Sequence, residues 1–367
     1  MKLIPTVVCA MATILAAGGG STGAAPQSPT GADGYVPTQL MAERASAGDP
    51  LRLHADPRLV DPWGIAVAPR AYAWVANRGT STSRHYDGNG NAVPRVVTLP
   101  PGVAGEAQPT GVVYDEAGRF RVADAGVSAT CSFIVVGASG TVTCWTPSDH
   151  PLEAAVQAYD GAASGTVYTG AAIARGRTAT WLYAVDFHNG TIDVFDTAFA
   201  RVAVPGRFVD PGLPAGYAPF GIEEIGGMLA VAYVRRDGSS DQALSGAGAG
   251  LVDVFDTDGR FVQRLVAPGG PLNAPWGMAQ APRDFGAYGG ALLVANGGDG
   301  TIDAFDPMTG AYLGALSHPG GAPLVIDGLH GIAFGRGLVD QAQDAPSLYY
   351  TAAPALGHGA YGRIDLH

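Results

Sequence analysis

Carboxylates and histidines that interrupt apolar segments are the residues of this sequence best suited to chemistry. Glu223 and Glu224 stand in PFGIEEI (219–225), a stretch that is apolar in its counterparts elsewhere in the chain. A carboxyl in such surroundings has a raised pKa and can act as an acid or a base. Strand alternation would expose only one of the two. His188 and His330 could serve as a base or bind zinc. No His pair has metal-ligand spacing, and a lone histidine more often packs with a hydrogen bond.

A glycine followed by an apolar strand recurs six times and indicates which elements position these residues. Neighbouring copies are 47 to 59 residues apart. The glycines are Gly64, Gly111, Gly170, Gly221, Gly277 and Gly331. Each unit holds about four short apolar runs bounded by Gly, Pro, Asn or Asp, as in PWGMAQA, GALLVAN, GTIDAFD and AYLGALS (275–317). The pattern predicts an all-β fold, a six-bladed β-propeller with four-stranded antiparallel blades. Glycine would let these strands approach closely around a narrow channel.

Two units depart from the repeat. The last one lacks a fourth strand, and TQLMAERA (38–45) belongs to no unit. We therefore expect this N-terminal run to pair with the last blade and close the ring, which would remove the open edges. Unit two has one strand-like run too many, and its spacing leaves open which run is inserted. The resulting division is a signal peptide (1–25), a linker (26–36) and a single propeller domain (37–367).

The repeated word GTIDVFD is interpreted as structural. Its aspartates recur at equivalent places, as Asp193, Asp253 and Asp303 and then as Asp196, Asp256 and Asp306. A single functional site would not recur three times in the sequence, and Asp commonly hydrogen-bonds the backbone at turns.

Function is expected where the repeat breaks, first at the residue before each glycine. These residues are Trp63, Thr110, Thr169, Phe220, Trp276 and His330. If the strands line a channel, these side chains form a ring at one mouth. The ring would be either an aromatic floor for a ligand or an apolar plug.

A second ring is expected at the ends of the second strands. Its members are Asn77, Asp124, Asp186, Tyr233, Asn296 and Ala352. Four of the six carry amide or carboxylate oxygens, which could hold Ca²⁺, but Asn and Asp also cap turns at such positions. No cofactor is expected apart from this possible Ca²⁺. The candidate ligand-binding residues at the channel mouth are Trp63, Asn77, Asp186, His188, Phe220, Glu223, Trp276, Asn296 and His330.

Composition excludes several classes of partner and chemistry. The net charge is −11 and no basic run appears, which argues against nucleic acid and anionic membranes as partners. Lys2 is the only lysine, so the rest of the chain lacks a lysine for Schiff-base or P-loop chemistry. No nucleophile elbow, Rossmann fingerprint, zincin helix or EF-hand loop is present.

The N-terminus and the cysteines point to export. Residues 1–25 combine Lys2, a short apolar stretch and small residues, as in a cleaved secretory signal; a short membrane anchor is the alternative. We expect a secreted or periplasmic protein with no membrane span after cleavage. Cys131 and Cys144 flank a hairpin expected to turn near 137–138, which would set them opposite each other. Export favours a disulfide over two free thiols.

Several stretches together resemble one family. DPRLVDPWGIAVAP, VDFHNGTIDVFD, LNAPWGMAQAP and LLVANGGDGTIDAFDPMTG look like an uncharacterised family of exported bacterial proteins, themselves similar to NHL-type six-bladed propellers. The resemblance implies the fold and leaves the activity open. Some members carry a C-terminal PEP-CTERM sorting tail, which is not expected here.

Two functional hypotheses follow. The first is a monomeric scaffold that binds a small molecule, glycan or protein at the channel mouth or on loops. The alternative is a metal-dependent hydrolase, lactonase-like, or a lyase acting at the central channel.

Overall fold

The computed structural model describes residues 34–44, 54–124, 127–146, 155–238, 240–340, 346–354 and 358–367. The predicted signal peptide and residues 26–33 of the predicted linker lie outside the described residues. The first strand begins at Tyr35, two residues before the predicted start of the propeller domain.

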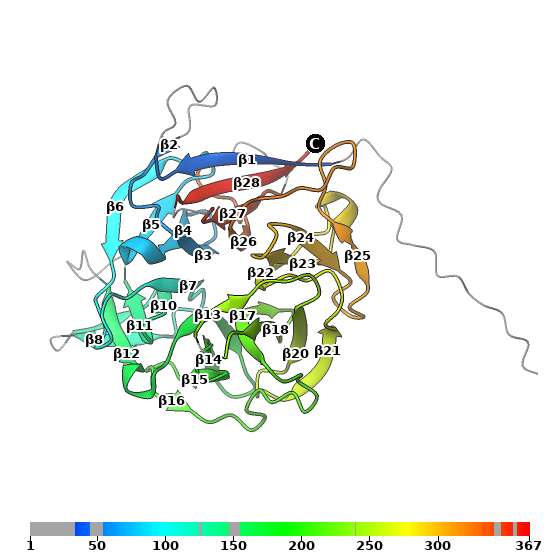
Figure 1. Cartoon of the computed structure of the whole chain (residues 1–367). Helices are drawn as coiled ribbons and strands as arrows, with labels where there is room; N and C mark the ends of the chain where they lie inside the picture. Colours follow the sequence, from blue (N-terminus) through cyan, green and yellow to red (C-terminus); the bar gives the residue numbers. More distant parts are fainter. Residues whose placement is uncertain are drawn as a thin grey trace, which may run out of the picture.

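Six antiparallel sheets surround a central axis, which confirms the six-bladed β-propeller (Figure 1). Blade one contains β3 (Pro62–Val67), β4 (Ala73–Asn77), β5 (Thr82–Tyr86) and β6 (Ala92–Thr98). Blade two contains β7 (Pro109–Tyr114), β10 (Phe133–Gly137), β11 (Thr141–Trp145) and β12 (Val156–Asp160). Blade three contains β13 (Tyr168–Arg175), β14 (Thr180–Asp186), β15 (Thr191–Phe195) and β16 (Arg201–Val202).

The other three blades repeat this order. Blade four contains β17 (Tyr217–Ile225), β18 (Met228–Arg236), β20 (Gly250–Phe255) and β21 (Phe261–Val266), with β19 (Ala243–Leu244) paired to β18. Blade five contains β22 (Pro275–Gln280), β23 (Leu292–Asn296), β24 (Ile302–Phe305) and β25 (Tyr312–Ala315). Blade six contains β26 (Leu329–Phe334), β27 (Leu348–Ala352) and β28 (Ala360–Leu366), completed by β1 (Tyr35–Ala42) and β2 (His54–Ala55).

The N-terminal strand closes the ring as predicted. β1 pairs antiparallel with β28, from Tyr35 opposite Leu366 to Ala42 opposite Ala360. In Figure 1 the blue first strand lies beside the red last strand. A strand from one end of the chain therefore completes the blade formed by the other end and covers the outer edge of β28.

Blade two contains the insertion that the sequence left unassigned. β8 (Arg121–Asp124) and β9 (Val127–Thr130) form a separate two-stranded hairpin between β7 and β10. The placement of Asp124 at the end of a second strand was therefore wrong. Gly137 holds that position, because it pairs with Pro109 as Asn77 pairs with Pro62 in blade one. RFRVAD alternates polar and apolar residues like a blade strand, but its strand β8 pairs with β9, which follows directly in the sequence.

The predicted disulfide between Cys131 and Cys144 is present. Its predicted geometry was wrong, because the β10–β11 hairpin turns later than expected and sets Cys144 opposite Ile134. Cys131 precedes β10 and follows the inserted hairpin. The bond therefore ties the hairpin's exit to strand β11, and both cysteines are buried in the core between blades two and three.

The repeated aspartates are structural, as predicted. Asp193, Asp253 and Asp303 are buried in strands and hydrogen-bond Tyr168, Arg264 and Asn296. Asp196, Asp256 and Asp306 each accept an N–H from two residues ahead, which fixes the turn after the third strand. The helices seen in the described residues are three 3₁₀ turns, Arg78–Thr80, Ala162–Ser164 and Gly286–Tyr288. None of these is long and apolar enough to cross a membrane.

Candidate functional site

The innermost strand of each blade lines a central channel. These strands are β3, β7, β13, β17, β22 and β26. Their first residues converge at one end, here called the aromatic mouth, and their last residues surround a pocket at the other end, here called the open mouth. The predicted site residues fall at both ends. Glu223 lies at the open mouth, and the other eight lie at the aromatic end.

A ring of glycines narrows the channel between its two mouths. A Cβ on Gly221 would lie 2.1 Å from the carbonyl oxygen of Trp276 in the next blade, and one on Gly277 would lie 2.4 Å from that of His330. The pattern continues around the ring, with Gly331 facing the carbonyl of Trp63 at 2.5 Å. Only about 40 Å³ of space remains beside these glycines. The predicted close approach of the inner strands is therefore confirmed.

Aromatic side chains fill the aromatic mouth. The Trp63 ring lies 5.9 Å from Phe220 and 5.8 Å from Trp276, and it stacks on His330 at 4.5 Å, measured between ring centroids. Blades one and four face each other across a six-bladed ring, so the Trp63–Phe220 contact crosses the channel. Phe220 and Trp276 are each 8% exposed. These contacts favour the plug over the ligand floor.

Hydrogen bonds hold the plug in place. The Trp276 indole donates to the backbone oxygen of Thr169 at 2.8 Å, and the Thr169 hydroxyl donates to the backbone oxygen of Phe220 at 2.7 Å. The His330 Nδ1 lies 2.8 Å from the backbone oxygen of Gly328. Burial among the rings lowers the pKa of His330. A neutral imidazole packed on a tryptophan fits the packing role that a lone histidine more often has.

The polar residues at the ends of the second strands are turn caps. Asp186 accepts from the Asn189 side chain at 2.7 Å and the Val167 N–H at 3.2 Å. Asn296 accepts the Asn273 N–H at 2.9 Å. Asn77 donates to the Thr82 hydroxyl at 3.4 Å. All three side chains are buried, and they bond residues that follow their own strands or precede the paired inner strand. Within the described ranges, no three His, Cys, Asp or Glu side chains come together as a metal site.

His188 lies outside the plug. Its Nδ1 is 3.0 Å from a carboxylate oxygen of Asp241, and 47% of its side chain is exposed. Asp241 belongs to the long insertion after β18, which folds back through β19. Ala243 of that strand packs against the aromatic cluster. The insertion therefore covers part of the aromatic mouth.

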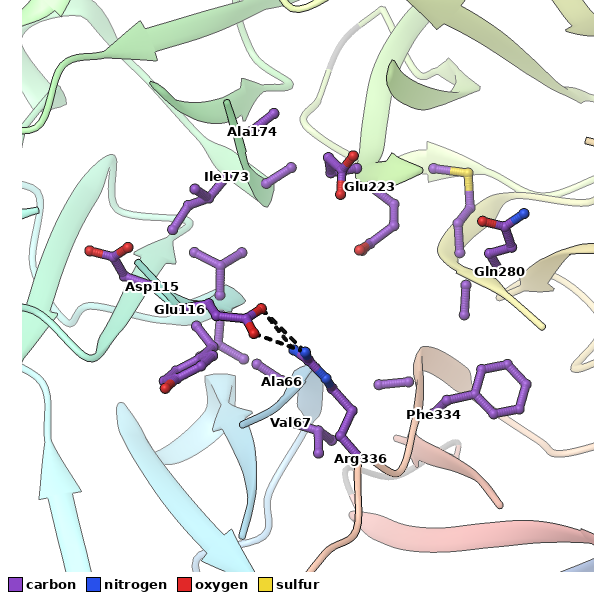
Figure 2. Close-up of a pocket in the computed structure, with 18 of the residues that line it drawn as sticks. Ala66, Val67, Asp115, Glu116, Ile173, Ala174, Glu223, Gln280, Phe334 and Arg336 are labelled. Atoms are coloured by element: carbon purple, nitrogen blue, oxygen red, sulfur yellow. Dashed lines mark hydrogen bonds and ion pairs between the residues drawn. The ribbon is translucent and has the colours of Figure 1, made fainter. Parts of the chain in front are cut away.

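The open mouth holds a pocket of about 680 Å³ that the ends of all six inner strands surround (Figure 2). Its inner walls are aliphatic, formed by Ile65, Val112, Ile173, Met278 and Ile332. Glu223, on β17, lines both this pocket and the narrow space beside the glycines. Its carboxyl thus stands at the inner end of the pocket.

Glu223 has no hydrogen bond or ion pair among the described residues, unlike Glu224, which accepts the Gly227 N–H at 2.6 Å. The channel walls strip water from the Glu223 carboxyl, and Glu224 repels its charge, so the pKa of Glu223 is raised to about 8. The side chain still reaches the water of the pocket. That water limits the loss of hydration that raises this pKa.

The rim of the open mouth carries charges that the sequence reasoning missed. Arg336, after β26, pairs with Glu116, after β7, at 3.2 Å (Figure 2). This ion pair reaches past blade one, since its partners come from blades six and two. Arg119, Arg175 and Gln280 complete the polar rim. A usable signal was present, because charged or amide residues stand at the ends of β13 and β22 and within two positions after β7 and β26.

The fold and the channel define a six-bladed β-propeller with one plugged and one open mouth. The chain is 35% identical over 305 residues to "Uncharacterized protein R648" of Acanthamoeba polyphaga mimivirus, covering 82% of this chain and 73% of that protein. It is 34% identical over 311 residues to "Uncharacterized protein L690" of the same virus, covering 83% and 79%. The chain belongs to the family of these mimivirus proteins. These relatives are viral, so they lend no support to the expected bacterial family.

The solved structures that resemble this chain show a likeness of fold alone. No family model matches the chain, so the likeness to NHL-type propellers rests on the sequence motifs. A streptogramin B lyase structure superposes with a TM-score of 0.52 at 12% identity, covering 91% of this chain and 98% of that one. A protein of unknown function from Bacteroides thetaiotaomicron gives 0.51 at 15% identity, covering 91% and 76%.

Proposed function

We propose that this protein is an exported ligand-binding propeller whose ligand occupies the open mouth. Export is supported by the Cys131–Cys144 disulfide, since such bonds persist in oxidising compartments, and by the apolar N-terminal stretch. The fold provides a rigid ring of strands, and the ring presents one pocket of ligand size at this end.

The observation that carries the proposal is the position of Glu223. The Glu223 carboxyl has no partner among the described residues and is exposed to the water of the pocket, so it is free to contact a ligand. Here it stands at the inner end of a pocket with aliphatic walls. A ligand that contacts Glu223 would satisfy it, while the walls would bury the rest of the ligand.

A thermal-shift screen of a charge-diverse small-molecule panel tests the proposal. Gln280→Trp would put a large ring into the pocket from an exposed rim position. Val262→Trp is the matched control, because Val262 is 49% exposed on the outer strand β21. Ligands should stabilise the native protein and the control and lose their effect on Gln280→Trp. Ligands that stabilise all three proteins equally would place binding elsewhere and refute the proposal.

The second candidate is an enzyme acting at the same mouth, either a lyase or a hydrolase. The raised pKa of Glu223 favours it, because an acid–base group works best when its pKa is close to the working pH. A metal-dependent, lactonase-like form has less support, since the part of the chain described gathers no metal-binding trio. Turnover of a lactone and ester panel that disappears in Glu223→Gln would favour this candidate over simple binding.

A further inference from the structure

We propose that the open mouth selects an organic cation, a protonated amine seated on Glu223 with its apolar body along the pocket walls. This inference rests on the proposed ligand-binding function and names its ligand class. It follows from the charge at the inner end, the character of the walls and the block at the glycine ring.

Two neighbouring carboxyl groups make the inner end of the pocket acidic, and a cation bound beside Glu223 favours the ionised form of that carboxyl. Glu223 has Glu224 as its chain neighbour, and the inner strands beside β17 contribute Ala172, Ile173 and Met278 near it. The arginines of the pocket come after the inner strands or at their ends, and the guanidinium of Arg336 is already paired with Glu116. An anion would have to lose its hydration beside two carboxylates, whereas a cation would gain an ion pair.

The pocket is also large enough for more than a bare ion, with a volume of about 680 Å³, and aliphatic side chains line its inner walls. The carboxyl stands where the pocket meets the glycine ring, and the space beyond is only about 40 Å³. A ligand therefore cannot thread through the channel. Its charged end stops at Glu223, and its body extends back along Ile65, Ile173 and Met278 toward the opening. The flexible Met278 thioether can adapt to bodies of different shape.

A metal ion fits this site poorly. Hard cations take several oxygen ligands, and in the described residues Glu223 is not joined by two further metal-binding side chains. A neutral ligand could hydrogen-bond the carboxyl, but it would not balance its charge. An ammonium group does both with a single contact, because it carries a positive charge and three donors.

Isothermal titration calorimetry of the folded mature protein with matched probes tests the ligand class. The probes are 2-phenylethylamine and hexylamine, their neutral counterparts 2-phenylethanol and hexanol, and 3-phenylpropionate. At least one amine should bind about tenfold or more tighter than its alcohol, and the carboxylate should not bind. Glu223→Gln keeps the side-chain size and should remove that preference, bringing the amine to the affinity of the alcohol.

Glu106→Gln is the matched control, since Glu106 is exposed and precedes β7, at the opposite end of the channel from the pocket, and it should change amine affinity by less than about threefold. An alcohol that binds as tightly as its amine would overturn the inference, as would an amine unaffected by Glu223→Gln or a failure of both amines to bind. If other ligands bind the native protein and are blocked by Gln280→Trp, the pocket function stands while the amine class fails. Loss of both results would reject the proposed function itself.

Discussion

Replacement of Gly221 by alanine should damage the propeller, while the same change at Gly170 should not. The two glycines hold equivalent positions in adjacent inner strands. A Cβ on Gly221 would lie 2.1 Å from the Trp276 carbonyl oxygen, where ordinary contacts begin at 3.4 Å, so blades four and five would have to separate by about 1.3 Å. A Cβ on Gly170 would lie 3.4 Å from its nearest neighbour, the Phe220 oxygen.

The expected costs follow from this difference in space. Overpacking against backbone that cannot rotate away should cost Gly221→Ala about 3 kcal/mol. That corresponds to a fall in Tm of roughly 5 °C for a chain of this size. Gly170→Ala should be neutral or stabilising by up to about 1 kcal/mol, because alanine has less freedom than glycine in the unfolded chain.

Differential scanning calorimetry of the two variants and the native protein measures these effects. Far-UV circular dichroism establishes that each variant is folded before melting. Equal Tm values for Gly221→Ala and Gly170→Ala would refute the reasoning, because the glycine ring would then not set the distance between blades. A large loss in Gly170→Ala would refute it as well.

Three further predictions concern the disulfide, a buried charge network and pH. Replacing Cys131 and Cys144 by serine releases a loop whose ends are 13 residues apart and should cost about 3 kcal/mol in urea unfolding; an unchanged midpoint would contradict this. Arg264→Ala removes the ion-pair partner of two buried carboxylates, those of Asp210 and Asp253, and should lower the free energy of unfolding by about 3 kcal/mol. Arg260→Ala breaks an exposed ion pair and should leave the Tm unchanged. The raised pKa of Glu223 makes the native protein lose stability as pH rises from about 4.5 to about 8, so Glu223→Gln should gain Tm over native across that range; a constant difference would contradict the shift.

The fold was predictable because the sequence pattern of strands and turns recurs in each blade. Ring closure followed from one missing strand in the last unit and one unassigned strand near the N-terminus, which β1 and β28 bear out. The strands of blade two could not be assigned from the sequence, because the segment that contains β8, which pairs locally with β9, alternates polar and apolar residues as a blade strand does. Sequence spacing does not distinguish a strand that pairs locally from one that joins the sheet.

The site was only partly predictable. Trp63, Phe220 and Trp276 were expected to meet, and they do, but their mutual contacts across the axis are a property of the closed ring. Glu223 could be found because it breaks an apolar pattern. The pairing of Arg336 with Glu116 could not, since it joins residues 220 positions apart whose approach depends on how the blades close.

The most direct test of the ligand pocket is a crystal structure of the protein soaked with 4-bromophenethylamine, with the bromine located by anomalous scattering. The account predicts a bromine peak between the aliphatic walls of the open mouth and an ammonium group within hydrogen-bond distance of the Glu223 carboxyl. A ligand found at the aromatic mouth, or one in the pocket with its ammonium group turned away from Glu223, would contradict it.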